Sequence, residues 1–443
     1  MAIYDKINIS KKLSILLIIS LGVYMKKFLS IVLSLLMVFS IVSCAKKSTG
    51  EVANAESAAA NVEKEATGVA QVNTADDGEK IIKIGVFEPQ SGQNGGGGKQ
   101  EVYGIRYANM IYNTITIGGE EYKIVLDEVD NQSNDTEAVS AAQKLVADRV
   151  NVVLGSYGSS VSIKAGPHFR KAEIPAIGCS CTNVQVTKGN DYYFRVCYLD
   201  PFQGRIMAQY AKKHNYNKVA VITELGDDYS TGLGKSFEDG CKELGIEVVS
   251  HHEFQKNEQD FNSILTKIKS ANPEFIFAPS SIVTAPLILT QARALNINCQ
   301  IGAGDTWENG TIITNARDAA NGIVVSTFYE AKSKEEAEGE EAVFLNGVNG
   351  DGNGFLEYLK SQDPKEEMIP AVSALGYDSY LAAYKAIEKA GSLEGPAIRD
   401  ALAELSFTGV TGDISFNSDG DAIKNTAYIK EVSEGQFVFK EKV

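Results

Sequence analysis

From Ile81 onward, short runs of apolar and β-branched residues alternate with segments in which apolar residues recur every three to four positions. The first pattern predicts buried β-strands and the second predicts amphipathic helices. The first set of predicted elements comprises strands at 81–89, 122–131, 151–156 and 174–180, and helices near 99–112 and 159–171. Between them, Asn134 or Asp135 can cap a further helix whose apolar positions run from Ala138 to Val146. Such alternation predicts a parallel sheet with helices on both faces.

The same rhythm begins again after about residue 200. The second set comprises strands at 218–224, 246–254, 275–280, 300–304 and 322–328, and helices near 231–244, 260–271 and 284–295. A region of this length exceeds what one core usually fills, so we expect an α/β protein of two doubly wound lobes with a ligand cleft between them. A helix at 374–391 and β segments at about 406–440 follow, and we expect the acidic, glycine-rich segment 331–354 to be an exposed insertion.

Two apolar runs precede the folded region. The second run, MKKFLSIVLSLLMVFSIVSC, starts at Met25 and has the basic start and apolar core of a secretory signal peptide. Its core is shorter than the roughly 20 apolar residues of a membrane span. The run ends in IVSC, which resembles a bacterial lipoprotein box, and this implies cleavage before Cys44 and lipidation of its thiol. An ordinary signal peptide followed by a buried cysteine is the alternative.

Residues 1–24 hold the first apolar run. Translation starting at Met25 would make them superfluous, and a hairpin of two membrane helices is the alternative. Residues 1–44 are therefore left out of the fold prediction. Residues 45–80 contain no aromatic residue, Leu or Ile, and this composition predicts a flexible tether.

Charge and cysteine content narrow the class of protein. The formal net charge is −15, which argues against a nucleic-acid partner because phosphate binding needs clustered Lys and Arg. Beyond Cys44 the number of cysteines is odd and no CxxC pair occurs, so no zinc site is indicated. We expect buried free thiols, and the sequence defines no disulfide pairing for Cys179, Cys181, Cys197, Cys241 and Cys299.

Enzyme motifs are missing from the sequence. GGGGKQ fails as a phosphate-binding loop, because Gln93 and Gln100 stand where Gly and Ser or Thr are required. No G-x-S-x-G or H-E-x-x-H motif occurs. The protein is therefore predicted to be no enzyme, and no cofactor or metal is indicated.

The loops that follow the predicted strands carry the candidate binding residues, since ligands bind beyond the carboxyl ends of parallel strands. GSYGSSVS offers Ser159 and backbone N–H groups at a helix N-terminus, which suit a carboxylate. GCSCTN repeats this arrangement with Ser180 and Thr182. Simple helix capping is the alternative interpretation of either loop alone.

The predicted second lobe offers residues that suit a positively charged group. Asp305 in GAGDTWENG can pair with an ammonium group, and Tyr229 in ELGDDYSTG can cover a ligand. An anion site on one lobe and a cation site on the other predict an amino-acid zwitterion bound between them. A ligand that makes its full contacts only when the lobes meet would drive closure.

Four stretches in order, IKIGVFEPQSG, VNVVLGSYGSS, IPAIGCSCTN and GYDSYLAAYKAI, resemble the periplasmic substrate-binding proteins of the branched-chain amino acid (Leu/Ile/Val) type. This resemblance implies the type I binding-protein fold, export to the periplasmic or cell-surface side as a lipid-anchored monomer, and delivery of ligand to an ABC-type permease. It also implies three strands joining the lobes. The implied lobe limits are 81–200 plus 331–405 for the first lobe and 201–330 plus 406–443 for the second.

The resemblance also assigns roles to residues. Ser159 matches the serine that binds the ligand α-carboxylate, and Ser180 and Thr182 match the pair that contacts carboxylate and ammonium. Tyr229 matches an aromatic of the second lobe, and Asp305 matches the acid that takes the ammonium. Cys181 lies between two of these positions and completes the candidate set.

One departure from the family concerns ligand selectivity. Many members carry an aromatic near Gly97, where this chain has only glycine. Tyr157 or Trp307 is therefore the candidate to line the pocket, and plain packing is the alternative for both. Open alternatives for function are a sensing module for a membrane receptor, and an amide or organic acid as the ligand.

Overall fold

The computed structural model of the protein describes residues 73–74 and 79–443. The predicted signal peptide with Met25 and Cys44, and most of the predicted tether, lie outside these residues. Asn73–Thr74 (β1) falls within the range predicted as tether and pairs antiparallel with β2 (Lys80–Glu88). Within the described ranges, no helix combines the length and the apolar character that a membrane crossing requires.

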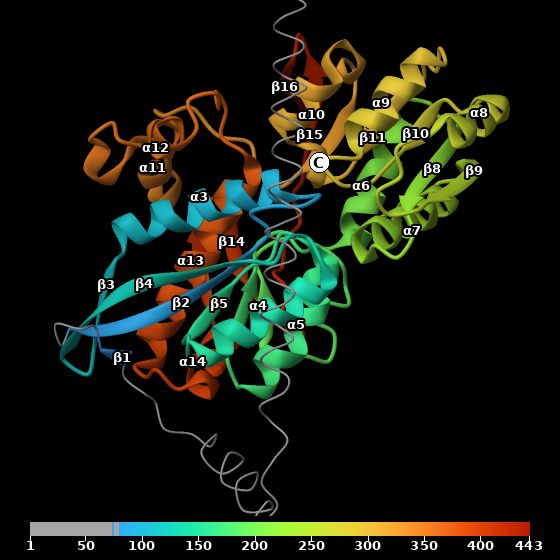
Figure 1. The fold of residues 1–443 in the computed structure, drawn as a ribbon. Helices are drawn as coiled ribbons and strands as arrows, with labels where there is room; N and C mark the ends of the chain where they lie inside the picture. The colour runs from blue at the N-terminus through green and yellow to red at the C-terminus, as the bar shows by residue number, and fades with distance from the viewer. Residues whose placement is uncertain (1–72, 75–78) are drawn as a thin grey trace, which may run out of the picture. The chain divides into compact units, whose positions relative to one another are not determined.

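The first sheet has the strand order β3-β4-β2-β5-β6-β7, with β1 beside β2. Helices α3 and α13 cover one face of this sheet, and α4 and α5 cover the other (Figure 1). We call this sheet and its helices lobe 1. Its elements are β3 (Thr114–Ile117), β4 (Glu120–Asp130), β5 (Val152–Leu154), β6 (Ala176–Gly178), β7 (Tyr193–Arg195), α3 (Gly95–Ile111), α4 (Asp135–Ala147), α5 (Ser159–Lys171), α13 (Ala371–Ala390) and α14 (Gly395–Ala403).

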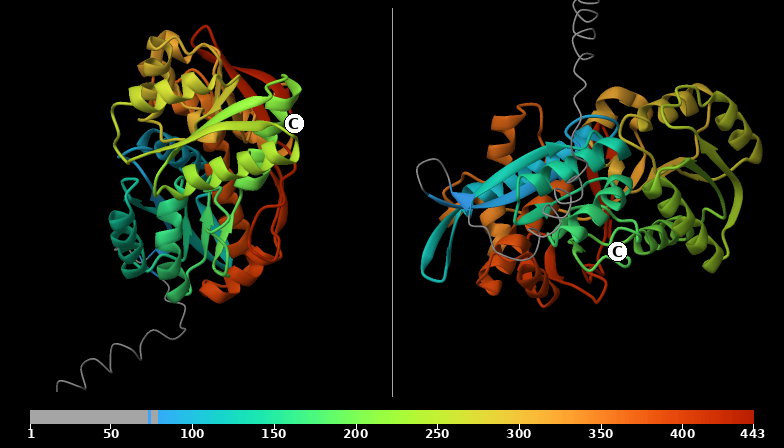
Figure 2. Two further views of the ribbon diagram at one scale, coloured as in Figure 1. Left: turned by 90° about the vertical axis from the view of Figure 1, so that its right-hand side faces the viewer. Right: turned by 60° about the horizontal axis from the view of Figure 1, so that its bottom comes forward.

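The second sheet has the order β16-β15-β12-β11-β10-β8-β9 and forms lobe 2 with its helices (Figure 2). Strands β8 to β12 run parallel, and β15 and β16 extend the sheet antiparallel. Its elements are β8 (Lys218–Glu224), β9 (Glu247–Phe254), β10 (Phe275–Phe277), β11 (Gln300–Ala303), β12 (Val324–Thr327), β15 (Tyr428–Ser433), β16 (Gln436–Lys442), α6 (Asp200–Lys213), α7 (Asp228–Glu243), α8 (Asn262–Ala271), α9 (Ala285–Ala294) and α10 (Gly310–Ala316). The prediction of two doubly wound, mainly parallel lobes is confirmed.

The chain passes between the lobes three times: from β7 to α6, from β12 towards α13, and from the hairpin β13 (Ser406–Gly409) and β14 (Gly412–Ser415) to β15. The hairpin belongs to neither large sheet, and Asp378 of α13 accepts a hydrogen bond from Val410 N at 2.7 Å. The lobe limits given by residue number remain a prediction.

A buried ion pair fixes the first crossing. Arg195, at the end of β7, donates to Asp421 at 2.7 Å and is fully buried. The same guanidinium donates to the carbonyl oxygens of Cys181 and Asn183 at 2.7 and 2.6 Å. The loop after β6 is thereby held to the hinge, and this loop is one of those expected to bind ligand.

The start of α3 differs from the prediction. The helix begins at Gly95 and not near Lys99, so the glycine run forms its first turn. A Cβ at Gly97 would lie 2.3 Å from the Tyr157 ring, and one at Gly98 would lie 2.1 Å from the Pro89 carbonyl oxygen. These glycines therefore permit α3 to pack closely against the loops that carry Tyr157 and Pro89. The prediction that GGGG forms a loop did not include this packing.

The segment 331–354 is only partly an exposed insertion. Helix α11 (Gly339–Asn346) lies within it and packs on α12 (Phe355–Gln362). Phe344 is fully buried, and its ring stacks on Phe355 at 4.6 Å. The many acidic residues of this segment concealed the apolar anchor in the sequence pattern.

The described cysteines are free thiols, as expected. All five that the structure describes are free, and Cys179, Cys181, Cys197 and Cys241 are buried, while Cys299 is half-buried.

Candidate ligand-binding site

Hydrogen bonds join the lobes across the cleft, so the structure is that of a closed state. Asp228 N donates to Ser160 Oγ at 2.8 Å, and Asn183 Nδ2 donates to the Asp228 carbonyl at 2.6 Å. On the other side, Ile282 N donates to Asn94 Oδ1 at 3.1 Å. Each of these bonds links lobe 1 to lobe 2.

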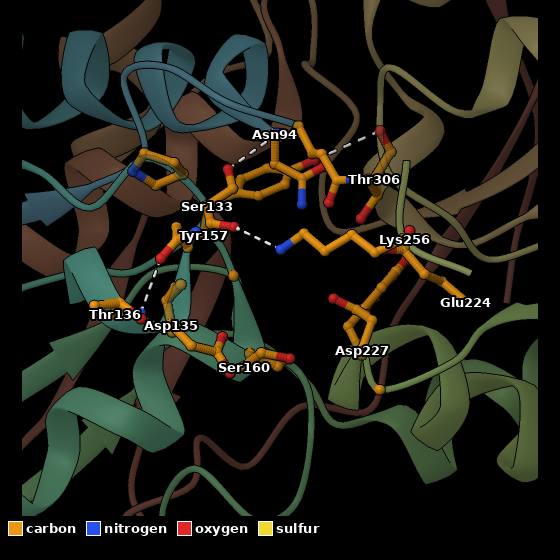
Figure 3. Close-up of a pocket in the computed structure, with 18 of the residues that line it drawn as sticks. Asn94, Ser133, Asp135, Thr136, Tyr157, Ser160, Glu224, Asp227, Lys256 and Thr306 are labelled. Carbon is orange, nitrogen blue, oxygen red and sulfur yellow. Dashed lines mark hydrogen bonds between the residues drawn. The ribbon is translucent and has the colours of Figure 1, made fainter. Parts of the chain in front are cut away.

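A cavity of about 260 Å³ lies between the lobes (Figure 3), a size that suits a small molecule. Its walls are mostly polar, and both lobes contribute to them. Among the lining residues are Asn94, Ser133, Tyr157, Ser159 and Ser160 from lobe 1, and Glu224, Asp227, Tyr229, Lys256 and Thr306 from lobe 2.

Tyr157 lies in the loop between β5 and α5 of lobe 1, and Ser159 lies at the end of this loop. Ser159 is the first residue of that helix, and its Oγ accepts from Asn183 N at 3.2 Å. The N-terminus of a helix favours negative charge, because its first N–H groups lack intrahelical acceptors. The ring of Tyr157 packs against Gly97, and its hydroxyl approaches the Thr306 carbonyl oxygen at 3.5 Å.

The loop after β6 places its three candidate side chains differently. Ser180 donates its hydroxyl to Glu101 Oε1 at 2.5 Å, so this hydrogen is engaged within lobe 1. Cys181 is buried in the core of lobe 1, where a Cβ on Gly178 would lie 2.3 Å from its sulfur. Thr182 Oγ1 is buried and has no hydrogen-bond partner among the described residues.

Asp305 begins a short 3-10 turn (Asp305–Trp307) directly after β11. It is almost fully buried and accepts hydrogen bonds from Gln203 Nε2 at 2.8 Å and from the Tyr229 hydroxyl at 3.1 Å. Burial raises the pKa of Asp305 to about 7, against the lowering effect of these two donors. A proton or a cationic ligand group is therefore the natural partner of this carboxyl.

Gln203 in α6 is a site residue that the sequence reasoning missed. Its amide nitrogen donates to Asp305, which only accepts when ionised, and the amide oxygen is left buried without a partner among the described residues. Its position among the buried residues of α6 was a detectable signal, since a glutamine on an apolar helix face needs polar partners.

Trp307 and Tyr157 were both candidates to line the pocket. Trp307 is fully buried and donates its indole N–H to the Ser280 carbonyl at 3.2 Å, so it packs inside lobe 2. Tyr157 lines the cavity and Trp307 is not part of its wall.

Lys256 was not anticipated either. Its Nζ crosses the cavity from lobe 2 and donates to the Ser133 carbonyl oxygen of lobe 1 at 3.3 Å (Figure 3). It lies in the loop after β9, and nothing in the sequence pattern distinguishes it from other surface lysines.

Taken together, lobe 1 presents a helix N-terminus with hydroxyl groups to the cavity. In lobe 2, Asp305 lies behind the wall and accepts from the hydroxyl of Tyr229, which does line the cavity. The other candidates, Ser180, Cys181 and Thr182, are not among the lining residues. Two sheets linked by three crossings, with a closing cleft between them, define the class of type I periplasmic binding proteins. Residues 81–436 match the family model described as "Periplasmic binding protein". The chain belongs to this family.

Solved structures and curated relatives agree with this assignment. The chain is similar to a leucine-binding protein LivK from Thermotoga maritima, with 32% identity, a TM-score of 0.73 and coverage of 82% of this chain and 99% of that one. It is also similar to the branched-chain amino acid substrate-binding protein LivJ from Streptococcus pneumoniae, solved with isoleucine, at 29% identity, a TM-score of 0.70 and coverage of 82% and 100%. A leucine-, isoleucine-, valine-, threonine- and alanine-binding protein from Pseudomonas aeruginosa is 25% identical over 349 residues, covering 78% of this chain and 87% of that protein.

Proposed function

We propose that this protein captures a small α-amino acid outside the cytoplasm and delivers it to an ABC transporter. Leucine, isoleucine and valine are the leading candidate ligands, because similar proteins are named for binding them. The observation that carries the proposal is the opposite polarity of the two lobes. Ser159 opens a helix on one side of the closed cleft, and Asp305 lies buried on the other.

The roles proposed for lobe 1 follow from its contacts. Ser159 and the backbone N–H groups at the start of α5 hold the ligand carboxylate, and the unpartnered hydroxyl of Thr182 contacts the same end of the ligand. Ser180 and Cys181 act through their backbone, because the side chains of both are engaged within lobe 1.

In lobe 2, Asp305 binds the ammonium group of the ligand, and Tyr229 and Gln203 orient the carboxylate of Asp305. Tyr157 closes the side-chain end of the cavity from lobe 1. The ligand thus bridges the lobes and stabilises the closed form, which is the form a transporter can distinguish from the empty one.

Membrane attachment is also part of the proposal. Cys44 ends an apolar run in a lipoprotein-like box, and lipidation there would tether the binding lobes to the outer side of a membrane. The protein then acts as a monomer that presents its ligand to a permease.

Substitution of Asp305 tests the proposed site. Asp305→Asn keeps the shape and the contact with Tyr229 but removes the negative charge, so amino-acid affinity measured by isothermal titration calorimetry should fall at least about a hundredfold. Glu253→Gln, an exposed carboxylate in β9, is the matched control and should bind as the parent does. Unchanged affinity of Asp305→Asn would remove this residue from the site.

A further inference from the structure

Two glutamates meet behind the loops that form the lobe 1 half of the site. Glu88 is the last residue of β2 and Glu101 lies in the second turn of α3. Both are fully buried. One oxygen of each and the sulfur of Cys179 all lie within 4.8 Å of one another.

Each glutamate holds one of the two loops. Glu88 Oε2 accepts from Tyr157 N at 2.7 Å, and Glu101 Oε1 accepts from Ser180 Oγ at 2.5 Å. A Cβ on Gly155 would lie 2.6 Å from Glu88 Oε1, so the first loop packs directly on this carboxyl group. Each loop is therefore held in position by a hydrogen bond to one oxygen of a buried carboxyl group.

The other two oxygens have no hydrogen-bond partner among the described residues. They are Glu88 Oε1 and Glu101 Oε2. Two buried carboxylates side by side would repel each other in a medium of low dielectric constant. In the part of the chain that the structure describes, none of the titratable groups that act on the pair from neighbouring elements is a cation; they include Cys179, Cys181, Cys197, Tyr157, Tyr193 and Asp305.

A single proton shared by the two glutamates would give both Glu88 Oε1 and Glu101 Oε2 a hydrogen-bond partner. If one carboxyl is protonated, its O–H donates to the other, which remains a carboxylate, and each group keeps the bond to its own loop. Cys179 would be the third ligand of a metal ion held here, and its thiol instead donates to Ser379 Oγ at 3.3 Å. Burial raises the pKa of both glutamates, that of Glu88 to about 8. The charge of Glu88 raises the pKa of Glu101 further, whereas the hydrogen bond with Glu101 lowers that of Glu88.

We propose that Glu88 and Glu101 share one proton and act as a positioning dyad that fixes the Tyr157 and Ser180 loops in their ligand-binding geometry. This rests on the proposed function in one respect, namely that these loops bind the ligand. Loss of the shared proton at alkaline pH, above the raised pKa of Glu101, leaves two charges facing each other and separates the loops. Affinity then falls with each further pH unit by up to about tenfold, because closing the site requires one proton to be taken up again.

The test compares two substitutions of Glu88. In Glu88→Gln the amide can donate to Glu101 and accept from Tyr157 N, but it cannot titrate. This variant should bind an amino acid at pH 7 within a few-fold of the parent, and its affinity should not show the additional loss at alkaline pH. Glu88→Leu removes both hydrogen bonds and should bind about tenfold or more weakly at every pH, as expected for an unpartnered buried N–H.

Two further measurements separate the dyad from other causes. The infrared difference spectrum of ligand-free parent minus Glu88→Gln at pH 7 should show the C=O band of a protonated carboxylic acid, and metal analysis of the purified parent should show no stoichiometric divalent ion. Glu253→Gln, exposed on β9, controls for removal of one carboxylate and should keep the alkaline loss of affinity, as the parent does.

The proposal is overturned if Glu88→Gln loses as much affinity at alkaline pH as the parent does, if the carboxylic-acid band is missing, or if a bound metal is found. Failure of the proposed function looks different. No amino acid then binds at any pH, while the infrared band still reports whether the shared proton exists.

Discussion

At the level of single residues, the binding site is defined by buried polar groups whose partners are incomplete. Asp305 is held by Gln203 and Tyr229 but has no cationic partner among the described residues. Thr182 Oγ1 and Gln203 Oε1 have no hydrogen-bond partner there. Unpaired buried polar atoms are costly, and the proposed ligand, with its ammonium group and carboxylate, would supply partners for them. None of these three side chains lines the closed cavity itself.

The raised pKa of Asp305 makes binding dependent on pH. Only the ionised carboxylate pairs with an ammonium group, so below its pKa of about 7 binding must first displace a proton. Affinity should therefore fall by up to about tenfold per pH unit as the pH drops from 7 to 5. Calorimetric titrations across this range measure the slope.

Another acid of the cleft needs a control in this experiment. Glu224 lines the cavity and its pKa is also raised to about 7, chiefly by burial. Glu224→Gln should keep the acid slope if Asp305 is responsible. A flat profile in the parent protein would show that no carboxylate with a raised pKa takes part in binding.

At the level of elements, periodicity predicted the alternation of strands and helices but not their exact contacts. The first turn of α3 shows why: Gly97 is required by the ring of Tyr157, which is far away in sequence, and Gly98 is required by the carbonyl of Pro89, whose approach depends on how the intervening loop folds. Ser159 and Asp305 could be chosen as candidates because they follow predicted strands, and their roles in binding stay a prediction. Gln203 and the Glu88–Glu101 pair could not, because their roles depend on which helix packs beside which strand.

The glycine at position 97 can be tested against a neighbour in the same helical turn. Gly97→Ala places a methyl group 2.3 Å from the Tyr157 ring, so it should lower the free energy of unfolding by about 1–3 kcal/mol and weaken ligand binding. Gly96→Ala has its nearest neighbour at 3.4 Å and should be neutral or stabilising by up to about 1 kcal/mol. Urea denaturation and calorimetric titration of both variants provide the comparison.

A double variant decides whether the ring is the cause. Combining Gly97→Ala with Tyr157→Ala removes the clash, so the two effects on stability should not add. Additive losses, or equal effects of alanine at 96 and 97, would contradict the packing account.

At the level of the whole molecule, two lobes and three chain crossings place the cleft where the strands of both sheets end. The structure is closed, with Asp228 and Lys256 of lobe 2 bonded to lobe 1. A ligand that bridges the lobes can select this state from an open one. The sequence predicted this architecture because both halves repeat the same alternating pattern.

The membrane anchor can be tested on the whole protein in the producing cell. Cys44→Ala removes the thiol that would carry the lipid, and the protein should move from the membrane fraction to the soluble fraction. Binding of ligand should not change, because the lobes are unaltered. Retention in the membrane fraction would contradict the lipid anchor.

The central claim is that the closed cleft binds a zwitterionic amino acid. A thermal-unfolding screen tests it most directly, using protein that has been unfolded and refolded to remove any copurified ligand, against the twenty amino acids and a set of amides and organic acids. A ligand at 100 times its dissociation constant adds about 2.7 kcal/mol to the free energy of unfolding, a shift of a few degrees or less at this size. We expect leucine, isoleucine, valine or a related amino acid to raise the midpoint; a rise only with amides or organic acids, or with none of the compounds, would contradict the account.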